Sequence, residues 1–313
     1  EAHCINREAG NRMYFTVTAE GKPLRQRRYC FSEGFYAIAN AEYYGVTGDA
    51  ACLERARAAY ELIYQLNNGL IQDPTGMGPK TISTTRTGRA LADPMIYLNI
   101  TSVLRRVDTD PERQKLYAAR AQECVETIFQ YHYKPELKCT LESVAPDGTP
   151  RLDVTEGRVV NPGHDIECSW FLMEAANYAH DAETHATAVK IFDQAFEAGW
   201  DKEYGGIFYF LDRKGAPRVE LEWDQKLWWV HIESTIAMIK GYQLTGSKAC
   251  LEWLGKLHEY PWAHFKDTEH PEWFGYLNRR GEVLLPLKGG KWKGCFHVPR
   301  GLFQCWQILE QCK

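Results

Sequence analysis

A helix junction that occurs twice constrains the fold of this chain more than any other feature of its sequence. Residues 44–54 and 242–252 share the pattern Tyr-x-x-Thr-Gly-x-x-Ala-Cys-Leu-Glu. Gly48 and Gly246 can adopt the left-handed conformation that ends one helix, and the Asp or Ser that follows can cap the next helix. Each junction therefore predicts an antiparallel helical hairpin.

Helical periodicity extends over most of the chain, whereas continuous strand signals are few. The nine predicted helical segments lie near residues 29–45, 49–67, 89–106, 111–133, 164–180, 183–199, 226–245, 247–261 and 296–312. Short polar turns predict β-hairpin tips at Glu20-Gly21, Asp147-Gly148, Lys214-Gly215 and Arg280-Gly281. Their glycines are 127, 67 and 66 residues apart, so the first separation is about twice each of the others. This spacing fits a recurring unit of one helical hairpin and one small β-hairpin.

The helices of such a unit differ in how their apolar residues are distributed. Segment 164–180 is apolar nearly all round, which is typical of an enclosed helix, whereas segment 111–133 is amphipathic. This contrast favours concentric helix layers, an all-α barrel with short β-hairpins between helix pairs, although an open superhelix of hairpins would give similar local signals. Because no Pro/Ser-rich linker divides the chain, we expect residues 1–313 to form a single barrel domain.

Charge and composition exclude several classes of partner. The chain has 37 Lys and Arg against 41 Asp and Glu, a net charge of −4, and no block of like charge suited to nucleic acid. No run approaches the roughly 20 apolar residues of a membrane span, and the first residues do not resemble a signal peptide. The ten cysteines are scattered without a CxxC pair, which is typical of reduced thiols. We therefore expect a cytoplasmic chain with neither nucleic acid nor membrane as partner.

The first candidate catalytic motif is Asn161–Leu172, in which a Pro-Gly turn leads into the enclosed helix. His164 lies at the start of that helix, and Glu167, three residues later, shares its face. An imidazole in this place could act as a base near neutral pH, with the carboxylate orienting it or holding a substrate hydroxyl. A capping histidine or one satisfied in the core would explain the motif equally well.

The second candidate motif, Lys226–Glu233, combines paired indoles with a histidine and a carboxylate. Indole faces stack on sugar rings, and imidazoles and carboxylates bind hydroxyls, so Trp229, His231 and Glu233 suit a carbohydrate ligand. Core packing by both tryptophans is the alternative, since aromatic residues at helical spacing are usually structural.

The third candidate motif follows a glycine-rich basic loop, residues 288–294. His297 lies there near the start of the last predicted helix, as His164 does in its own segment. Two bases that act on opposite faces of one carbon must come from different elements, and these two histidines could converge only across a closed ring. No His/Cys/Asp spacing matches a zinc site, so we expect no metal.

Together the three motifs resemble those of the N-acylglucosamine 2-epimerase family. Its members carry Pro-Gly-His-x-x-Glu-x-x-Trp-Phe-Leu, Lys-x-Trp-Trp-x-His-x-Glu and Lys-Gly-Cys-Phe-His-Val-Pro-Arg, all present here in that order. Further matches at residues 28–33, 93–95 and 272–277 extend the resemblance over nearly the whole chain. The Lys-Gly-Cys-Phe-His run is the most specific and points to the N-acylglucosamine branch rather than to cellobiose 2-epimerases or mannose-type isomerases.

The resemblance implies an (α/α)6 barrel of twelve helices. With nine helices predicted, about three N-terminal helices are expected to be absent, and the barrel domain would be incomplete at its N-terminus. The family also places a catalytic or substrate-binding arginine in that part, to which no residue of this sequence can be assigned. Val230 is a departure, because close relatives often have proline there.

The resemblance also implies an activity, the interconversion of N-acetylglucosamine and N-acetylmannosamine at C2 of the open-chain sugar. His164 and His297 match the family's acid/base pair. No metal or redox cofactor is required, ATP is implied as an allosteric activator, and a homodimer is expected. The implied substrate contacts are Glu167, Trp229, His231, Glu233 and Arg28.

Three other functions remain open at this point. An aldose–ketose isomerase on the same barrel would move the proton between C2 and C1 with one base. A glycoside hydrolase would use a carboxylate pair, for which Glu167 and Glu233 are available, but the two histidines in matching motifs argue against it. A non-catalytic module resembling renin-binding proteins would keep the fold for partner contacts alone.

Overall fold

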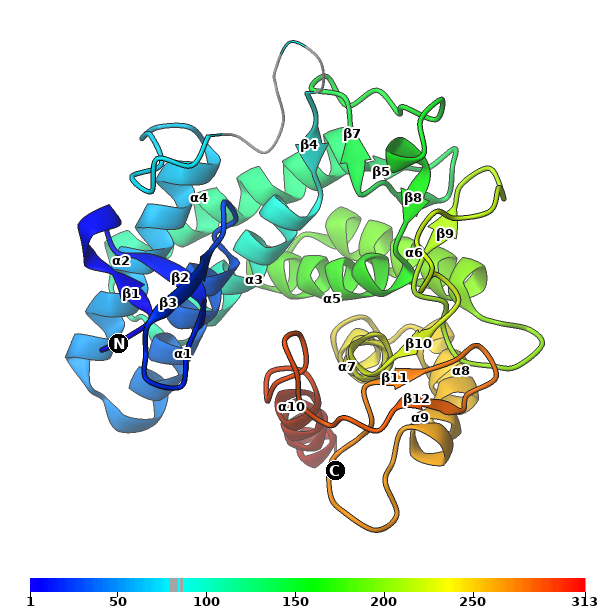
Figure 1. Ribbon diagram of the computed structural model, residues 1–313. Coiled ribbons are helices and arrows are strands. Elements are labelled where there is room, and N and C mark those ends of the chain that lie inside the picture. The colour runs from blue at the N-terminus through cyan, green and yellow to red at the C-terminus, as the bar shows by residue number, and fades with distance from the viewer. Residues whose placement is uncertain (79–83, 85–86, 313) are drawn as a thin grey trace. The chain divides into compact units, whose positions relative to one another are not determined.

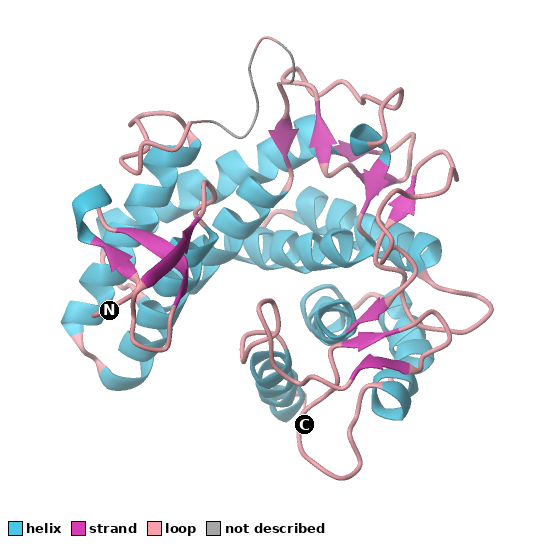
Figure 2. Ribbon diagram, viewed as in Figure 1, coloured by secondary structure: helices cyan, strands magenta, loops and turns pink. Residues whose placement is uncertain are grey.

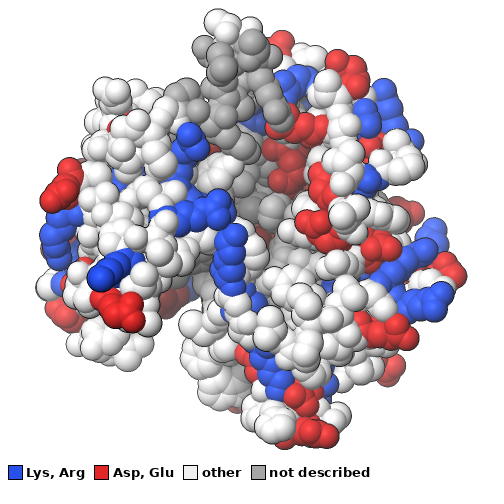
Figure 3. Space-filling model, viewed as in Figure 1, with Lys and Arg blue, Asp and Glu red and all other residues white. Residues whose placement is uncertain are grey.

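The computed structural model describes residues 1–78, 84 and 87–312. These residues form two compact units, each built mainly of helices with short antiparallel strands beside them (Figures 1 and 2). Within the part of the chain that is described, no helix is long and apolar enough to cross a membrane. Basic and acidic side chains are interspersed over the face shown in Figure 3, in keeping with the net charge of −4.

The described residues of the N-terminal unit, residues 1–88 and 92–126, form a three-stranded antiparallel sheet, a short 3-10 helix (Arg7–Ala9) and four α-helices. The strands are β1 (Ile5–Asn6), β2 (Arg12–Val17) and β3 (Pro23–Gln26), with β2 in the centre. The helices are α1 (Phe31–Thr47), α2 (Ala50–Asn67), α3 (Ala92–Val107) and α4 (Pro111–Thr127). Arg12 is fully buried, and its Nε donates to Glu33 Oε1 at 2.7 Å, so an internal ion pair joins the sheet to α1.

Both predicted helix junctions are found. Gly48 has φ 72° and donates its N–H to the Tyr44 carbonyl at 2.8 Å, and Asp49 caps α2 by accepting from the Ala51 N–H at 3.0 Å. Gly246 has φ 67° and ends α7 in the same way. Ser247 differs from the prediction, because its hydroxyl makes no capping hydrogen bond to α8.

The C-terminal unit, residues 89–91 and 127–313, contains the remaining helices and four small antiparallel β pairings or sheets. The helices are α5 (Pro162–Ala179), α6 (Ala182–Gly199), α7 (Trp228–Thr245), α8 (Lys248–Leu257), α9 (Glu259–His264) and α10 (Val298–Gln311). The paired strands are β4 (Arg89–Ala90) with β7 (Ser143–Val144), β5 (Tyr133–Lys134) with β6 (Cys139–Thr140), and β8 (Val159–Val160) with β9 (Leu211–Asp212). A three-stranded sheet is made by β10 (Lys226–Leu227), β11 (Tyr276–Leu277) and β12 (Val283–Leu285).

Two helices of the C-terminal unit are enclosed, as the apolar character of segment 164–180 predicted for α5. Helix α5 packs against both α6 and α7, and α7 also packs against α10. Buried residues occur on every side of α5 and α7, whereas α6 and α10 have one buried face. The three candidate motifs lie at the N-terminal ends of α5, α7 and α10, so this packing sets the geometry of the site.

Two predicted helices end differently in the structure. Segment 111–133 leaves the α-helix after Thr127 and continues as one π-helical turn, Ile128–His132. Segment 247–261 is divided between α8 and α9. Pro261 causes this division because it has no N–H to donate to the carbonyl one turn earlier, at Leu257.

Candidate functional site

The start of α5 places the first candidate residue. Asn161 caps the helix, its Oδ1 accepting from the His164 N–H at 3.2 Å, and Pro162 occupies the first turn, where no N–H is needed. Gly163 allows the indole of Trp229 to approach the helix, since a Cβ at this position would lie 2.6 Å from the Trp229 ring. Capping and close packing together fix where the His164 ring lies.

His164 is paired with a carboxylate from another element. Its Nδ1 lies 2.8 Å from Oε1 of Glu142, which lies between β6 and β7. Asp165, the next residue on α5, accepts from the Thr140 N–H at 3.3 Å and from the Thr140 hydroxyl, and this anchors the helix beside that segment. Burial disfavours the charged imidazolium, but the adjacent Glu142 carboxylate outweighs it and raises the pKa of His164 to about 9. His164 is therefore an imidazolium at neutral pH.

His297 is paired in the same way with a carboxylate on α7. It lies immediately before α10, and its Nδ1 is 2.8 Å from Oε1 of the fully buried Glu233. The same oxygen contacts the Arg300 guanidinium, and Arg300 Nε donates to the Phe296 carbonyl at 3.0 Å. Burial works against the charge of Glu233, but Arg300 and His297 lower its pKa below the usual value. Glu233 is an ionised carboxylate that orients His297.

Glu167 lies beside this second pair. The carboxylates of Glu167 and Glu233 and a ring nitrogen of His297 offer atoms that all lie within 4.8 Å of one another. Burial, and then the negative charge of Glu233, raise the pKa of Glu167 to about 7. A cation at these atoms would compete with the Arg300 guanidinium for Glu233, so we interpret the three residues as an acid/base cluster.

Both candidate histidines lie beside one indole ring. The centroid of the Trp229 ring is 5.2 Å from that of His164 and 5.9 Å from that of His297. The neighbouring Trp228 is a core residue, almost completely buried and edge-on to Tyr276 at 5.1 Å. Trp228 also lies edge-on to His297, at 6.3 Å between ring centroids, but Trp229 is the indole that contacts both histidines.

Two of the predicted contacts, His231 and Arg28, form hydrogen bonds within their own units. His231 is fully buried, where its Nδ1 is 2.7 Å from the Leu227 carbonyl and its Nε2 accepts from the Ile207 N–H at 3.1 Å. Both ring nitrogens thus have backbone partners, and burial lowers the pKa of His231 to about 3. Arg28 belongs to the N-terminal unit, where its Nε donates to the Gly78 carbonyl at 2.7 Å.

The structure adds two residues that the sequence motifs did not identify. Glu142 is 22 residues from His164 in the chain, and its only sequence signal is an acidic residue within an apolar stretch. Arg300 lies inside the third motif, but its contact is with Glu233, 67 residues away. Neither pairing follows from local spacing.

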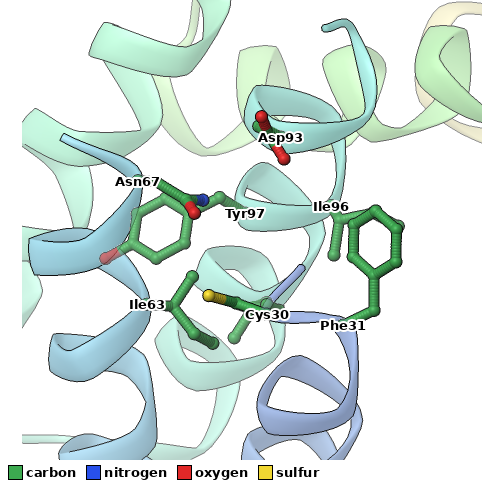
Figure 4. Close-up of a pocket in the computed structure, with 8 residues that line it drawn as sticks. Cys30, Phe31, Ile63, Asn67, Asp93, Ile96 and Tyr97 are labelled. Atoms are coloured by element: carbon green, nitrogen blue, oxygen red, sulfur yellow. The ribbon is translucent and has the colours of Figure 1, made fainter. Parts of the chain in front are cut away.

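A small pocket in the N-terminal unit is a second place where polar groups converge (Figure 4). Its lining residues are Cys30, Phe31, Ile63, Asn67, Asp93, Ile96, Tyr97 and Ile100. Burial raises the pKa of Cys30 to about 12, so the thiol is protonated and a poor nucleophile. Tyr97 donates its hydroxyl to the Tyr60 carbonyl at 3.4 Å, which gives this tyrosine a structural role.

Comparison with curated proteins gives a consistent set of relatives. Residues 1–299 match the family model described as N-acylglucosamine 2-epimerase (GlcNAc 2-epimerase). The N-acylglucosamine 2-epimerase of Mus musculus is 39% identical over 301 residues, 96% of this chain and 70% of that protein. The Homo sapiens N-acylglucosamine 2-epimerase is 36% identical over 96% of this chain and 69% of its own length. A cellobiose 2-epimerase of Bacteroides fragilis is 24% identical over 99% of this chain and 78% of that protein.

Solved structures with the same fold are more distant in sequence. Cellobiose 2-epimerase from Bacillus thermoamylovorans has a TM-score of 0.80 at 18% identity, over 98% of this chain and 78% of that one. A D-mannose isomerase has a TM-score of 0.71 at 19% identity, over 93% of this chain and 73% of that one. This likeness confirms the predicted fold class, an all-α (α/α)6 barrel fold with small β-hairpins.

Proposed function

The chain belongs to the N-acylglucosamine 2-epimerase family of isomerases, and from this membership we propose that it interconverts N-acetylglucosamine and N-acetylmannosamine by inversion at C2. The observation that supports this function best is the pair of carboxylate-bound histidines, His164 and His297, both of which lie beside the indole of Trp229. Two imidazoles, each held by its own carboxylate, are what a proton transfer on both faces of one carbon requires.

The chemistry begins with the acidity that the C1 aldehyde gives to the C2 proton of the open-chain sugar. One base removes this proton to give an enolate, and an acid returns a proton to the other face. His164 is an imidazolium at neutral pH and suits the acid. Because the Nδ1 of His297 is bonded to Glu233, its Nε2 is the nitrogen that we assign as the base.

One turnover leaves the two histidines in the opposite protonation states. His297 would then hold the proton taken from C2, and His164 would be neutral, which is the arrangement that the reverse reaction needs. The raised pKa of His164 favours its return to the imidazolium form. The epimer processed by the resting enzyme is therefore the one whose C2 proton faces His297.

Recognition of the sugar is assigned to the groups around these histidines. We propose that the Trp229 face stacks on the sugar and that Glu167 and Glu233 contact the reacting end. His231 is left out because both of its nitrogens already have backbone partners. Arg28 stays a proposed substrate contact, to be tested by the effect of Arg28→Gln on KM.

Enolate formation needs only acid/base groups, and the epimerases of this family generally work without a cofactor. We propose ATP as an allosteric activator rather than a reactant, a cytoplasmic location and a homodimer. Initial rates measured with and without ATP, together with light scattering on the purified chain, test the first and last of these.

The test of the proposed function is proton NMR of N-acetylglucosamine incubated with the purified chain. We expect N-acetylmannosamine to appear, and to be lost in His164→Asn and His297→Asn. His270→Asn is the matched control, since the His270 side chain is 76% exposed. Conversion of a free aldose to its ketose without any epimer of the amino sugar would replace this function with that of an isomerase.

A further inference from the structure

Two buried carboxylates lie beside the same histidine, and only one of them is neutralised. Glu233 shares one oxygen with His297 and with the Arg300 guanidinium. Glu167 is 5% exposed and lies within 4.8 Å of Glu233 and His297, measured between their ligand atoms. Among the described residues, no hydrogen bond or ion pair joins Glu167 to a cation. The two glutamates are thus both buried but have very different partners.

When two carboxyl groups lie this close together in a buried site, ionisation of the second one is disfavoured. The Arg300 guanidinium compensates Glu233, so the proton goes to Glu167. The raised pKa of Glu167 and the lowered pKa of Glu233 agree with this division. Glu167 is therefore a hydrogen-bond donor mainly below about pH 7, which an ionised carboxylate is not.

Resting on the proposed epimerase function, we propose that Glu167 is a catalytic residue whose neutral carboxyl donates a hydrogen bond to the C1 oxygen of the open-chain sugar. Glu167 is one helical turn from His164 on α5 and beside His297, so it adjoins both groups that exchange the C2 proton. The atom that gains negative charge as C2 loses its proton is the C1 oxygen. A donor placed there lowers the barrier for removal and return of the proton alike.

The step balances without any further reactant. A histidine takes the proton from C2, the electron pair of that C–H bond forms the C1–C2 double bond, and the carbonyl pair moves to the C1 oxygen. The Glu167 O–H shares its proton with this oxygen while the enolate exists. When the other histidine protonates C2, the C1 carbonyl forms again and the proton remains on Glu167.

Two substitutions of Glu167 test whether its carboxyl acts on the sugar as a hydrogen-bond donor or as an acceptor. Gln keeps the shape and a neutral N–H donor, whereas Ala keeps neither. For removal of one such donor we expect Glu167→Ala to lower kcat by about 100- to 1,000-fold. We expect Glu167→Gln to keep kcat within about tenfold of the original chain, because the donor is retained. Glu174→Gln, seven residues further along α5, is the matched control and should leave kcat unchanged.

The pH profile supplies a readout that a structural role would not move. In the original chain kcat should fall as the pH rises through about 7, because Glu167 must be protonated to donate. Glu167→Gln should lose this fall and keep only the one near pH 9 from His164. The groups that set the charge around Glu167 are Glu233 on α7, His164 on α5, and His297 and Arg300 at the start of α10.

The outcomes are distinct from those that test the epimerase function itself. If the original chain exchanges the C2 proton but Glu167→Gln is as slow as Glu167→Ala, Glu167 acts as an acceptor and the proposal is overturned. An unchanged fall near pH 7 in Glu167→Gln overturns it as well. Should Glu167→Ala fail to fold by circular dichroism, the Gln variant and its pH profile still decide. Failure of the original chain to exchange the proton refutes the epimerase function instead.

Discussion

His164 and Glu142 form a hydrogen-bonded pair, with Nδ1 and Oε1 2.8 Å apart, in which the carboxylate more than offsets the effect of burial on the imidazole. This pair differs from the one between His297 and Glu233, whose carboxylate is shared with Arg300. The Glu142 carboxylate is hydrogen-bonded to His164, whereas one Glu233 oxygen is shared between His297 and the Arg300 guanidinium. The two histidines of the site therefore have unlike surroundings, which suits an acid and a base in the same resting enzyme.

Removing the charge of Glu142 should lower the pKa of His164. In Glu142→Gln we expect the imidazole to titrate well below about 9, and kcat to fall by about 10- to 100-fold because the resting acid is lost at neutral pH. NMR titration of labelled histidine measures the pKa. Glu136→Gln, an exposed change in the nearby β5–β6 turn, should leave it unaltered, and an unchanged pKa in Glu142→Gln would contradict the assignment.

The same pair makes stability depend on pH. Because the folded chain raises the pKa of His164, the stabilisation is complete below the unfolded value of about 6.5 and is lost as the pH rises through about 9. The difference in free energy of unfolding between the original chain and Glu142→Gln should therefore shrink over this window. Urea unfolding at pH 6 and pH 9.5 measures it, and a difference that grew with pH would refute the sign.

Arg300 should matter for stability as well as for catalysis. Arg300→Met leaves the Glu233 charge buried without a guanidinium, which we expect to cost about 3 kcal/mol of unfolding free energy. Adding Glu233→Gln should restore much of that stability but not the activity, since the double variant lacks the carboxylate that orients His297. Thermal unfolding and epimerisation assays test this pattern, with the exposed Arg213→Met as control. Full activity in Arg300→Met would exclude the role assigned to it.

Substitution of Gly163 tests whether the position of the Trp229 indole matters for sugar binding. A Cβ at Gly163 would lie 2.6 Å from the Trp229 ring, so Gly163→Ala should displace the indole and raise KM by about 10-fold or more through misplacement of the sugar. Gly255→Ala is the matched control in another helix, where no atom lies within 4 Å of the added Cβ. That control should gain up to about 1 kcal/mol of stability. A KM equal to that of the original chain in Gly163→Ala would show that Trp229 does not bind the sugar.

His231 should affect the stability of the fold rather than the chemistry. Its two backbone hydrogen bonds are buried, so His231→Ala should cost at least about 2 kcal/mol while the folded fraction keeps its kcat. Since folding lowers its pKa to about 3, the stabilisation from the neutral ring is present above about pH 6.5 and falls as the pH drops toward 3. Activity normalised to folded protein, measured by circular dichroism, distinguishes the two roles.

Local sequence patterns predicted much of the fold because they depend on neighbouring residues. The Gly48 and Gly246 junctions follow from the left-handed conformation that glycine adopts at the end of a helix. The division of segment 247–261 at Pro261 is also local and could have been predicted from the missing N–H of proline.

The site was less accessible to sequence patterns because its decisive contacts join distant residues. The motifs predicted His164 and His297 as candidates. The carboxylate partner of His164, however, lies on a loop, and that of His297 lies on another helix. His231 has the same local context as Trp229 and Glu233, yet its ring points into the core toward Ile207. Only the tertiary structure separates these roles.

The central claim is that His164 and His297 act on opposite faces of C2, and isotope exchange in deuterated water tests it most directly. We predict that each epimer formed early in the reaction carries one deuterium at C2. We also predict that His164→Asn exchanges the C2 proton of one epimer without inverting it, while His297→Asn does so only with the other. Two results would contradict the two-base account. One is a product that retains its original proton at C2. The other is that one histidine variant abolishes exchange of both epimers while the other histidine variant still inverts them.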